Sequence, residues 1–392
     1  MMTPKQRMVT AFRHGVPDRV PVSPDISNMI PCRLTGKPFW DIYLYRDPPL
    51  QVAYVEAVKY FGFDGFYFTI LGGHAVGKAR AGPWLYWPDS WKTVEERKEE
   101  RAIIVRKMVE TPLGALYWEK LYRIDDPPCN THSPIVDREQ DFAKVKWLLE
   151  EEWQWEKKYH DYRLIGDLCS FGTGTYLPID WWMSLREGGI SQMIFDCMDA
   201  PQFMEQVFRF YTEHEIERLK VHLRAKPTPD VVGIQGSASS FSVISPIIFR
   251  QYNLLFLKEV TRLCQKAGVP SHLHVCGRSK GIVEMVYQET DLNVMEPLER
   301  PPGGDVDLKE AKRRFKDKLV LKGNVNTFQT MFRGTPKEVE EEALRCIEAA
   351  ASGGGFILAT GDQCPRDTPD ENIFALIETA RKFGKYEGKN KI

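Results

Sequence analysis

A histidine, a cysteine and a second, distant cysteine are the residues of this chain whose types and spacing best fit metal chemistry. His274-Val275-Cys276 closes a short apolar stretch, and Cys364 follows far downstream. Residues i and i+2 of a strand point to the same face, so His274 and Cys276 can hold one ion. Imidazole and thiolate are ligands that zinc prefers, and three protein ligands beside an open position are typical of a catalytic zinc site.

Polar residues at the ends of other apolar segments are candidates for proton transfer or substrate contact. Asp25 and Asp167 each end such a segment and are predicted to supply or accept a proton. Either of them could equally cap the helix that follows. Asn324 is a third candidate catalytic residue, with a backbone tie as its alternative role. His272 shares the inward face of His274, either as a site residue or as a packed core histidine.

Eight short apolar segments, most of them followed by a helical pattern, predict the strands that position these residues. The segments are residues 19–25, 64–70, 162–167, 230–235, 271–276, 292–296, 319–324 and 355–360. This count predicts a (β/α)8 TIM barrel, whose catalytic groups lie at the C-terminal ends of the strands. A doubly wound open sheet is the alternative, but no Gly-rich dinucleotide turn follows the first segment. His274, Cys276, Glu296, Asn324 and Cys364 are therefore expected at one mouth.

The strand–helix rhythm breaks at about residues 76–135, which are rich in Trp, Tyr and β-branched residues. Residues 102–106 and 114–118 are separated by Thr111-Pro112-Leu113, a pattern typical of a hairpin. We therefore predict a single (β/α)8 barrel domain over residues 1–392, with a β-hairpin-rich insertion that caps the site. The glycine clusters at 172–174 and 353–355 lack the Walker lysine pattern and are interpreted as turns.

The composition excludes several classes of function. Of 392 residues, 43% are hydrophobic and 27% charged, and the net charge is −1 without a basic stripe, which argues against nucleic-acid binding. No apolar run approaches the roughly 18 residues of a membrane span, and the start reads as an amphipathic helix rather than a signal peptide. The sequence thus predicts a cytoplasmic protein. The eight irregularly spaced cysteines are expected to be thiols.

Along essentially its whole length the chain resembles the uroporphyrinogen decarboxylase superfamily. The similarity is carried by residues 2–7 (MTPKQR), 17–22 (PDRVPV), 273–277 (LHVCG), 321–325 (LKGNV) and 367–372 (DTPDEN). The decarboxylase branch carries an Arg-Gln-Ala-Gly-Arg-Tyr run after the first strand, where its arginines bind tetrapyrrole carboxylates. Residues 25–32 of this chain (DISNMIPC) contain no arginine. The resemblance therefore disfavours a metal-free, porphyrinogen-type decarboxylase.

The second branch contains the corrinoid-dependent methyltransferases, and His274, Cys276 and Cys364 match its zinc signature position by position. This match implies bound Zn²⁺ and a corrinoid carried by a partner protein. The site also resembles the zinc site of cobalamin-independent methionine synthases, where a glutamate on the next strand joins the ligands. On that resemblance, Glu296 is the candidate fourth ligand and Glu299 the second choice.

The expected activity is transfer of a methyl group between a small molecule and the corrinoid. Zinc bound to the heteroatom would stabilise the charge that develops as the methyl group leaves. Aromatic residues favour a flat apolar donor such as a methoxylated aromatic, as in an O-demethylase component. They are Trp84, Tyr86, Trp87, Trp91, Tyr117 and Trp118, with Phe66, Tyr67, Phe68, Trp181 and Trp182. Transfer from methyl-corrinoid to a thiol, of the coenzyme M type, is the alternative.

Overall fold

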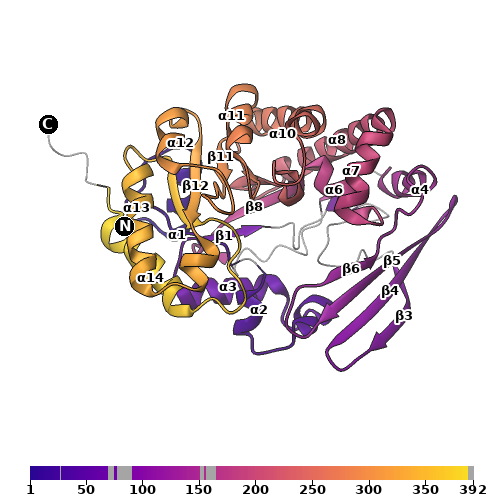
Figure 1. Cartoon of the computed structure of the whole chain (residues 1–392), viewed down its shortest axis with the longest axis horizontal. Helices are drawn as coiled ribbons and strands as arrows, with labels where there is room; N and C mark the ends of the chain where they lie inside the picture. Colours follow the sequence, from indigo (N-terminus) through magenta and orange to yellow (C-terminus); the bar gives the residue numbers. More distant parts are fainter. Residues whose placement is uncertain (27, 69–74, 77–90, 151–153, 156–164, 387–392) are drawn as a thin grey trace.

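A parallel, curled sheet of seven strands forms the centre of the molecule (Figure 1). The computed structural model describes residues 1–26, 28–68, 75–76, 91–150, 154–155 and 165–386. In spatial order the strands are β1 (Gly65–Phe68), β8 (Cys169–Tyr176), β9 (Val231–Gln235), β10 (Ser271–His274), β11 (Val294–Glu296), β12 (Val320–Val325) and β13 (Phe356–Thr360). Each strand of the sheet lies beside the next one along the chain, as repeated strand–helix units require.

The later strands lie close to where the sequence places them. The segments predicted at 230–235, 271–276, 292–296, 319–324 and 355–360 are confirmed as β9 to β13, with small differences at their ends. Every residue of β10, β11, β12 and β13 is buried. Strands covered on both faces read as continuous apolar runs, which is why the sequence reveals them. β1 confirms the segment predicted at 64–70, of which residues 69 and 70 lie outside the described residues.

The third predicted strand, at residues 162–167, is not found in its described part, since residues 165–167 form a helical turn. The strand in this place is β8, Cys169–Tyr176, and it contains the glycines that were interpreted as a turn. A Cβ atom at Gly172 would lie 3.3 Å from the side chains of both Phe66 and Val231. A side chain at this position would press on its neighbours, so glycine suits the close packing inside this strand. Residues 162–164 lie outside the described residues.

The first predicted segment, residues 19–25, links the two edges of the sheet without forming a regular strand. Val22 pairs in parallel with Leu358 of β13, and the Ser23 amide donates to the Leu358 carbonyl at 2.9 Å. On the other side, the amide of Asp64, just before β1, donates to the Val22 carbonyl at 2.9 Å. The segment therefore bonds to both neighbours, as a strand between β13 and β1 would.

Helices return the chain from one strand to the next and cover the sheet. They are α3 (Leu50–Phe61), α8 (Pro201–Arg224), α10 (Leu254–Ala267), α11 (Lys280–Glu289), α12 (Leu308–Phe315), α13 (Pro336–Ala350) and α14 (Asp370–Phe383). Two of them have side-chain caps: Asp307 accepts from the Glu310 amide at α12, and Thr335 and Glu338 form a capping box at α13, where the Thr335-Pro336 pair predicts a helix start. Shorter pieces complete the loops. These are α2 (Ile30–Leu34), η1 (Asp41–Tyr45), α6 (Pro178–Leu185), α7 (Gly189–Asp199), η4 (Ser237–Ser239), α9 (Pro246–Ile248), η5 (Phe249–Asn253) and η6 (Thr327–Phe332).

Helix α1 (Pro4–Phe12) packs against β1, β8 and β13. Its residues Met8, Ala11 and Phe12 are fully buried. They form one apolar cluster with strand residues of the sheet: Phe66, Val231, Val294, Val320 and Ile357. The helix thus fills the amino end of the sheet with hydrocarbon, which leaves the carboxyl ends of the strands for polar chemistry.

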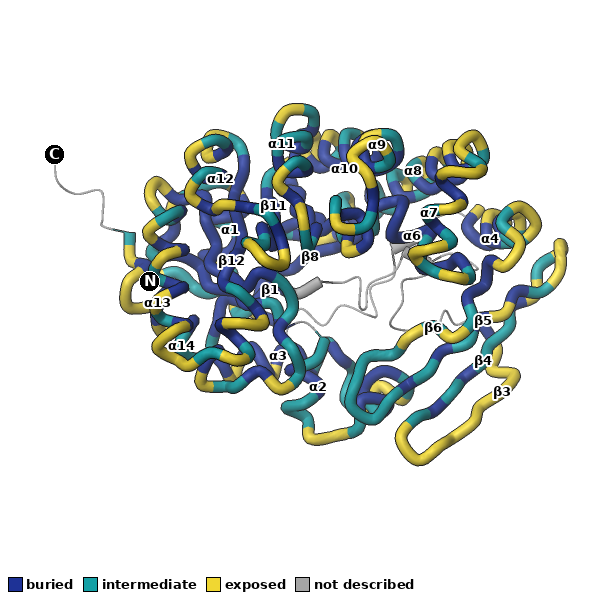
Figure 2. The backbone as a smooth tube through the Cα atoms, in the orientation of Figure 1, coloured by how far each residue is buried: buried dark blue, intermediate teal, exposed yellow. Residues whose placement is uncertain are grey.

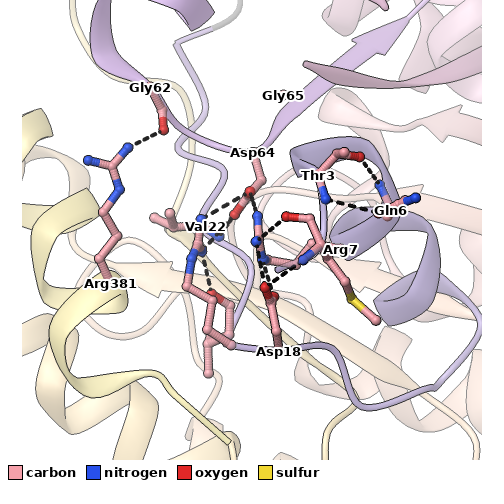
Figure 3. A network of polar contacts seen from close by, with 12 residues as sticks. Thr3, Gln6, Arg7, Asp18, Val22, Gly62, Asp64, Gly65 and Arg381 are labelled. Carbon is pink, nitrogen blue, oxygen red and sulfur yellow. Dashed lines mark hydrogen bonds and ion pairs between the residues drawn. The ribbon is translucent and has the colours of Figure 1, made fainter. Parts of the chain in front are cut away.

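A network of buried ion pairs holds the segment after α1 against the amino end of the sheet (Figure 3). The Arg7 guanidinium donates to Asp18 Oδ1 and to Asp64 Oδ1, both at 2.6 Å. Arg19 donates to Asp64 Oδ2 at 2.8 Å, and the Val22 amide donates to the same oxygen at 2.9 Å. The pKa of Asp18 is lowered, because its bonds to Arg7 and to the backbone outweigh the effect of burial.

A separate antiparallel sheet of four strands, which we call the cap, lies beside the parallel sheet (Figure 1). Its strands are β3 (Lys92–Lys98), β4 (Ala102–Thr111), β5 (Gly114–Arg123) and β6 (Cys129–His132), and α4 (Gln140–Leu149) packs on it. The predicted hairpin is confirmed, since β4 and β5 pair from Ala102–Arg123 to Thr111–Gly114. The edge strand β3 is exposed along its whole length (Figure 2). Among the described residues, no helix is both long and apolar enough to cross a membrane.

Candidate functional site

A cavity of about 440 Å³ opens at the carboxyl ends of the strands. It is lined by the segment after Val22, with Ser23, Asp25, Ile26 and Asn28, and by residues of β9 to β13 and the turns after them. Its polar side chains include Asp25, Gln235, His274, Cys276, Glu296, Lys322 and Asp362. The carboxyl ends of parallel strands are where α/β proteins place their sites.

Three side chains converge at this cavity in a way that suits a metal ion. One ligand atom each from His274, Cys276 and Asp362 lies within 4.8 Å of the other two. The Nε2 atom of His274 is 3.7 Å from Asp362 Oδ1. His274 and Cys276 come from the end of β10 and Asp362 from the turn after β13. The predicted His-x-Cys pair therefore shares one face, and the structure adds a carboxylate to it.

Glu296, predicted as the fourth metal ligand, has both carboxylate oxygens engaged elsewhere. Its Oε1 lies 3.3 Å from Nδ1 of His274 and 3.1 Å from Nε2 of His272. Its Oε2 forms an ion pair with the Nζ of Lys322. A carboxylate on Nδ1 fixes the ring and tautomer of a histidine so that Nε2 stays available. The structure thus places Glu296 behind His274, away from the group that His274 forms with Cys276 and Asp362.

Burial and mutual contacts shift the pKa values of the side chains around His274. Burial opposes a charge on His274, but hydrogen bonds with Cys276 and Glu296 outweigh burial and raise the pKa of the imidazole well above its ordinary value. Burial opposes ionisation of Glu296 too, yet His272 and Lys322 hold the pKa of this carboxyl well below its ordinary value. Burial lowers the pKa of His272, and the nearby Glu296 carboxylate opposes this shift.

Cys364, the predicted distant ligand, is not a member of the converging group. Its side chain is fully buried, and its amide donates to the Asp25 carbonyl at 2.7 Å. Burial raises the pKa of the thiol strongly, with Asp25 adding to the effect and a hydrogen bond to Thr360 opposing it. Two residues earlier, Asp362 turns toward His274 instead. In this structure the turn after β13 thus brings Asp362, rather than the predicted Cys364, to His274 and Cys276.

The predicted catalytic residues Asp25 and Asp167 lie at opposite ends of the sheet. Asp25 lines the cavity, and its amide donates to Thr360 Oγ1 at 3.0 Å. Asp167 precedes β8 at the amino end of the sheet, where its carbonyl accepts from the amide of Lys5, so the structure does not bring it to the cavity.

Asn324 and Glu299 serve the backbone around the cavity. The Nδ2 atom of Asn324 donates to the Leu298 carbonyl at 2.8 Å, and its Oδ1 accepts from the thiol of Cys346 on α13, so its side chain faces the helix layer. Glu299, the second choice for the fourth ligand, accepts from the amide of Gly277 at 2.7 Å. It therefore fixes the turn that follows Cys276.

Aromatic rings line the cavity, but mostly not those that the sequence singled out. Phe66 is the predicted ring found there, joined by Tyr54 of α3 and Tyr176 of β8. Trp91 and Trp118 pack on each other in the cap, with ring centres 5.6 Å apart. Trp181 and Trp182 are buried in α6, Tyr117 is exposed on the cap, and Trp84, Tyr86 and Trp87 lie outside the described residues.

Comparison with known proteins gives matches of two kinds. The sequence profile described as "Uroporphyrinogen decarboxylase (URO-D)" matches residues 171–383. The chain is 23% identical over 154 residues to methylcobamide:CoM methyltransferase MtbA of Methanosarcina mazei, which covers 39% of this chain and 42% of that protein. It is 28% identical over 156 residues, with the same coverage, to methylcobamide:CoM methyltransferase MtaA of Methanosarcina barkeri. It is also 30% identical over 87 residues to uroporphyrinogen decarboxylase of Wigglesworthia glossinidia brevipalpis, covering 22% of this chain and 24% of that protein.

The matched region spans less than half the length of these curated relatives. A solved structure, a methyltransferase from Methanosarcina mazei, aligns with 98% of this chain and 99% of its own, with a TM-score of 0.64 and 18% identity. At that identity the likeness establishes the fold: an α/β architecture around a curled parallel sheet.

Proposed function

Because the chain belongs to the uroporphyrinogen decarboxylase family, we propose that it is a zinc-dependent methyltransferase of a corrinoid system. It would move a methyl group from a small methylated donor to the Co(I) of a corrinoid held by a partner protein. The observation that carries the proposal is the convergence of an imidazole, a thiol and a carboxylate at a cavity on the carboxyl ends of the strands.

These donors fit zinc in type and in number. Nitrogen, sulfur and oxygen ligands from three side chains, beside an open position, are typical of catalytic zinc. His274, Cys276 and Asp362 would hold the ion, and Cys364 is the second sulfur within the same turn as Asp362. When bound, zinc supplies a Lewis acid for the heteroatom from which the methyl group departs.

The remaining cavity residues have roles that follow from their contacts. Glu296 accepts from Nδ1 of His274 and keeps Nε2 directed to the cavity, while Lys322 holds Glu296 in its ionised form. The product heteroatom takes up one proton as its bond to the methyl carbon breaks. Asp25 lines the cavity and is our candidate for the carboxyl group that delivers this proton.

The walls of the cavity favour a flat, apolar donor, and we propose a methoxylated aromatic. Tyr54, Phe66 and Tyr176 supply ring surface on which such a donor can pack. None of the described cavity residues is an arginine, whereas a porphyrinogen with its many carboxylates would need several cations. This observation argues against decarboxylation of a porphyrinogen.

Transfer from methyl-corrinoid to a thiol is the second candidate. It is favoured by the two methyltransferase relatives, whose names give a methylcobamide as donor and CoM as acceptor. A thiol would use the same donor set, because zinc keeps a bound thiol deprotonated.

Spectra of the corrinoid distinguish the two candidates. Zinc-loaded protein is mixed with Co(I) corrinoid and a series of methoxylated aromatics, and separately with methylcob(III)alamin and thiols. The proposal predicts loss of the Co(I) spectrum with at least one methyl ether, and no such loss with Cys276→Ala. Demethylation of methylcob(III)alamin by a thiol, without reaction of any ether, would instead support the second candidate.

We also propose that the parallel sheet closes into an eight-stranded barrel within one domain, with the cap as an insertion. Support comes from the bonds of Val22 and Ser23 to Leu358 on one side and to Asp64 on the other. An experimental structure showing a gap between β13 and β1 would contradict this closure.

A further inference from the structure

The turn η4, directly after β9, touches the sulfur of Cys276. The carbonyl of Ser237 accepts a hydrogen bond from Cys276 Sγ at 3.7 Å, and Ser237 itself lines the cavity. The turn has little freedom to move alone. A Cβ atom at Gly236 would lie 2.5 Å from Leu177 and 3.1 Å from Val275, so the backbone is packed closely on both sides.

A network of hydrogen bonds between buried polar side chains holds this turn in place. Asp180, in the first turn of α6, accepts the amide of Ala238 on Oδ1 at 2.6 Å and the hydroxyl of Ser239 on Oδ2. Asn253 at the end of η5 donates to Ser239 Oγ at 2.8 Å. Its own carbonyl oxygen accepts the amide of Ile179 at 3.4 Å.

The three side chains of this network are almost completely removed from solvent. Asp180 is 3% exposed, and Ser239 and Asn253 are 0% exposed. Burying an ionisable carboxyl is costly unless its oxygens are satisfied, and here both accept hydrogen bonds from the same three-residue turn. The network joins α6, η4 and η5, and it reaches the cavity through the carbonyl of Ser237.

We propose that Asp180, Ser239 and Asn253 are positioning residues for the metal centre. In the metal-free chain the Ser237 carbonyl accepts a hydrogen bond from the Cys276 thiol, and by fixing this carbonyl the three side chains hold the sulfur beside His274 and Asp362 before an ion binds. The thiol gives up its proton when zinc binds, so the network would act by holding the empty site in a geometry ready for the ion. This inference rests on the proposed function, and it assigns the network to metal geometry in addition to stability. None of the three side chains touches the substrate or the ion.

Metal binding gives the first test, using the full chain and the variants Ser239→Ala and Asp180→Asn. The two oxygens of Asp180 accept from the Ala238 amide and the Ser239 hydroxyl, whereas an asparagine offers one oxygen and one NH2 group. One hydrogen bond to the turn is therefore lost. Loss of an outer partner typically weakens metal affinity about 10–100-fold. We expect both variants to bind zinc more weakly by that factor, and their Co²⁺-substituted forms to show a changed visible spectrum.

Thr175→Ala provides a matched control. Thr175 is also buried, and its hydroxyl donates to Glu215 Oε2 at 2.5 Å, but on the face of β8 that contacts α8. Its loss should lower the melting temperature as Ser239→Ala does, while zinc affinity and the Co²⁺ spectrum stay unchanged. Equal losses of zinc affinity in Thr175→Ala and Ser239→Ala would overturn the inference. They would show that the effect on zinc binding comes from lower stability alone.

Alkylation of Cys276 gives a second readout that needs no metal. Iodoacetamide labelling, followed peptide by peptide in a mass spectrometer, should be several-fold faster at Cys276 in metal-free Ser239→Ala than in the wild type or Thr175→Ala. An unchanged rate overturns the inference whatever the metal data show. If the wild type takes up no zinc, the proposed function fails, whereas faster labelling in Ser239→Ala still supports the network as the device that fixes Cys276.

Discussion

Buried charged side chains gather at both ends of the parallel sheet, and the two groups differ in what they face. At the amino end, Arg7 and Arg19 surround Asp64, and the Val22 amide completes its shell. At the carboxyl end, the ionisable side chains around His274 line a cavity of about 440 Å³. The amino-end group satisfies its charges internally and joins segments of the chain, whereas the carboxyl-end group keeps donor atoms turned toward open space.

This contrast separates polar groups that support the fold from polar groups available for chemistry. Burial and ion pairing are common to both ends, so neither property alone marks a site. The marks that differ are the cavity and the convergence of three unlike donor atoms, which only the carboxyl-end group has among the described residues. Substitutions at the carboxyl end should therefore lower zinc affinity more than stability. Substitutions at the amino end should lower the free energy of unfolding and leave zinc affinity unchanged.

The largest expected effect is the loss of zinc from Cys276→Ala. Removal of a ligand should weaken zinc affinity by more than the about 10–100-fold that loss of an outer partner costs. Elemental analysis and chelator competition measure the affinity, and a melting curve checks the fold. Cys169→Ala is the control, since Cys169 is buried at the start of β8, at the amino end of the sheet. Equal loss of zinc in both variants would contradict the assignment of the site.

The converse variant, Asp64→Asn, should unfold more easily while keeping its metal. It leaves Arg7 and Arg19 without the carboxylate between them. Breaking one partner of a buried ion pair costs about 3–5 kcal/mol. Urea denaturation measures the free energy of unfolding, and zinc affinity of the folded protein should stay at the wild-type value. A strong loss of zinc affinity in folded Asp64→Asn would break the distinction between the two ends.

Lys322→Met tests a side chain that has features of both groups. Lys322 forms a buried ion pair, as at the amino end, but it also lines the cavity. The substitution removes the ion pair between Lys322 and Glu296. The Glu296 carboxyl should then become easier to protonate and should hold the His274 ring less firmly. We expect an about 10–100-fold loss of zinc affinity. Lys312→Met is the control: Lys312 is also buried, but it donates to the Gly354 carbonyl far from these donors. Unchanged zinc binding in Lys322→Met would limit Lys322 to a structural role.

The smallest expected effect is a pH dependence at the amino end. The pKa of Asp18 is lowered in the folded chain by its bonds to Arg7 and to the backbone. Its ionised form therefore stabilises the fold above the pKa of the unfolded chain, and this contribution is lost as pH falls through the lowered, folded pKa. Wild type and Asp18→Asn should differ in urea stability near neutral pH and converge at strongly acidic pH. A difference that grows on acidification would contradict this account.

The sequence predicts the later strands well for a physical reason. Strands buried on both faces must be continuous apolar runs, and β9 to β13 are such runs. β8 escapes this pattern because glycine stands where Phe66 and Val231 pack closely, and Gly-Thr-Gly also resembles a turn. Local sequence does not reveal which neighbour approaches a strand.

The site divides in the same manner. His274 and Cys276 are found because the alternation of a strand fixes their common face. That alternation ends with β13, so the conformation of the following turn decides that Asp362, not Cys364, approaches His274. The position of Asn324 near the end of a strand predicts the edge of the sheet on which it lies. It does not predict the direction of the side chain, which here faces α13.

The pairing of Val22 with Leu358 has a consequence for biosynthesis. The wall of the cavity that carries Asp25 follows Val22 directly, so it leaves the ribosome early and must wait for β13, nearly the last strand to be translated. Contacts between such distant parts of a chain form slowly, and partly assembled sheets expose apolar edges. Nascent chains halted before residue 356 should therefore present α1 and the early strands to chaperones, and they should acquire metal-binding competence only after β13 has emerged.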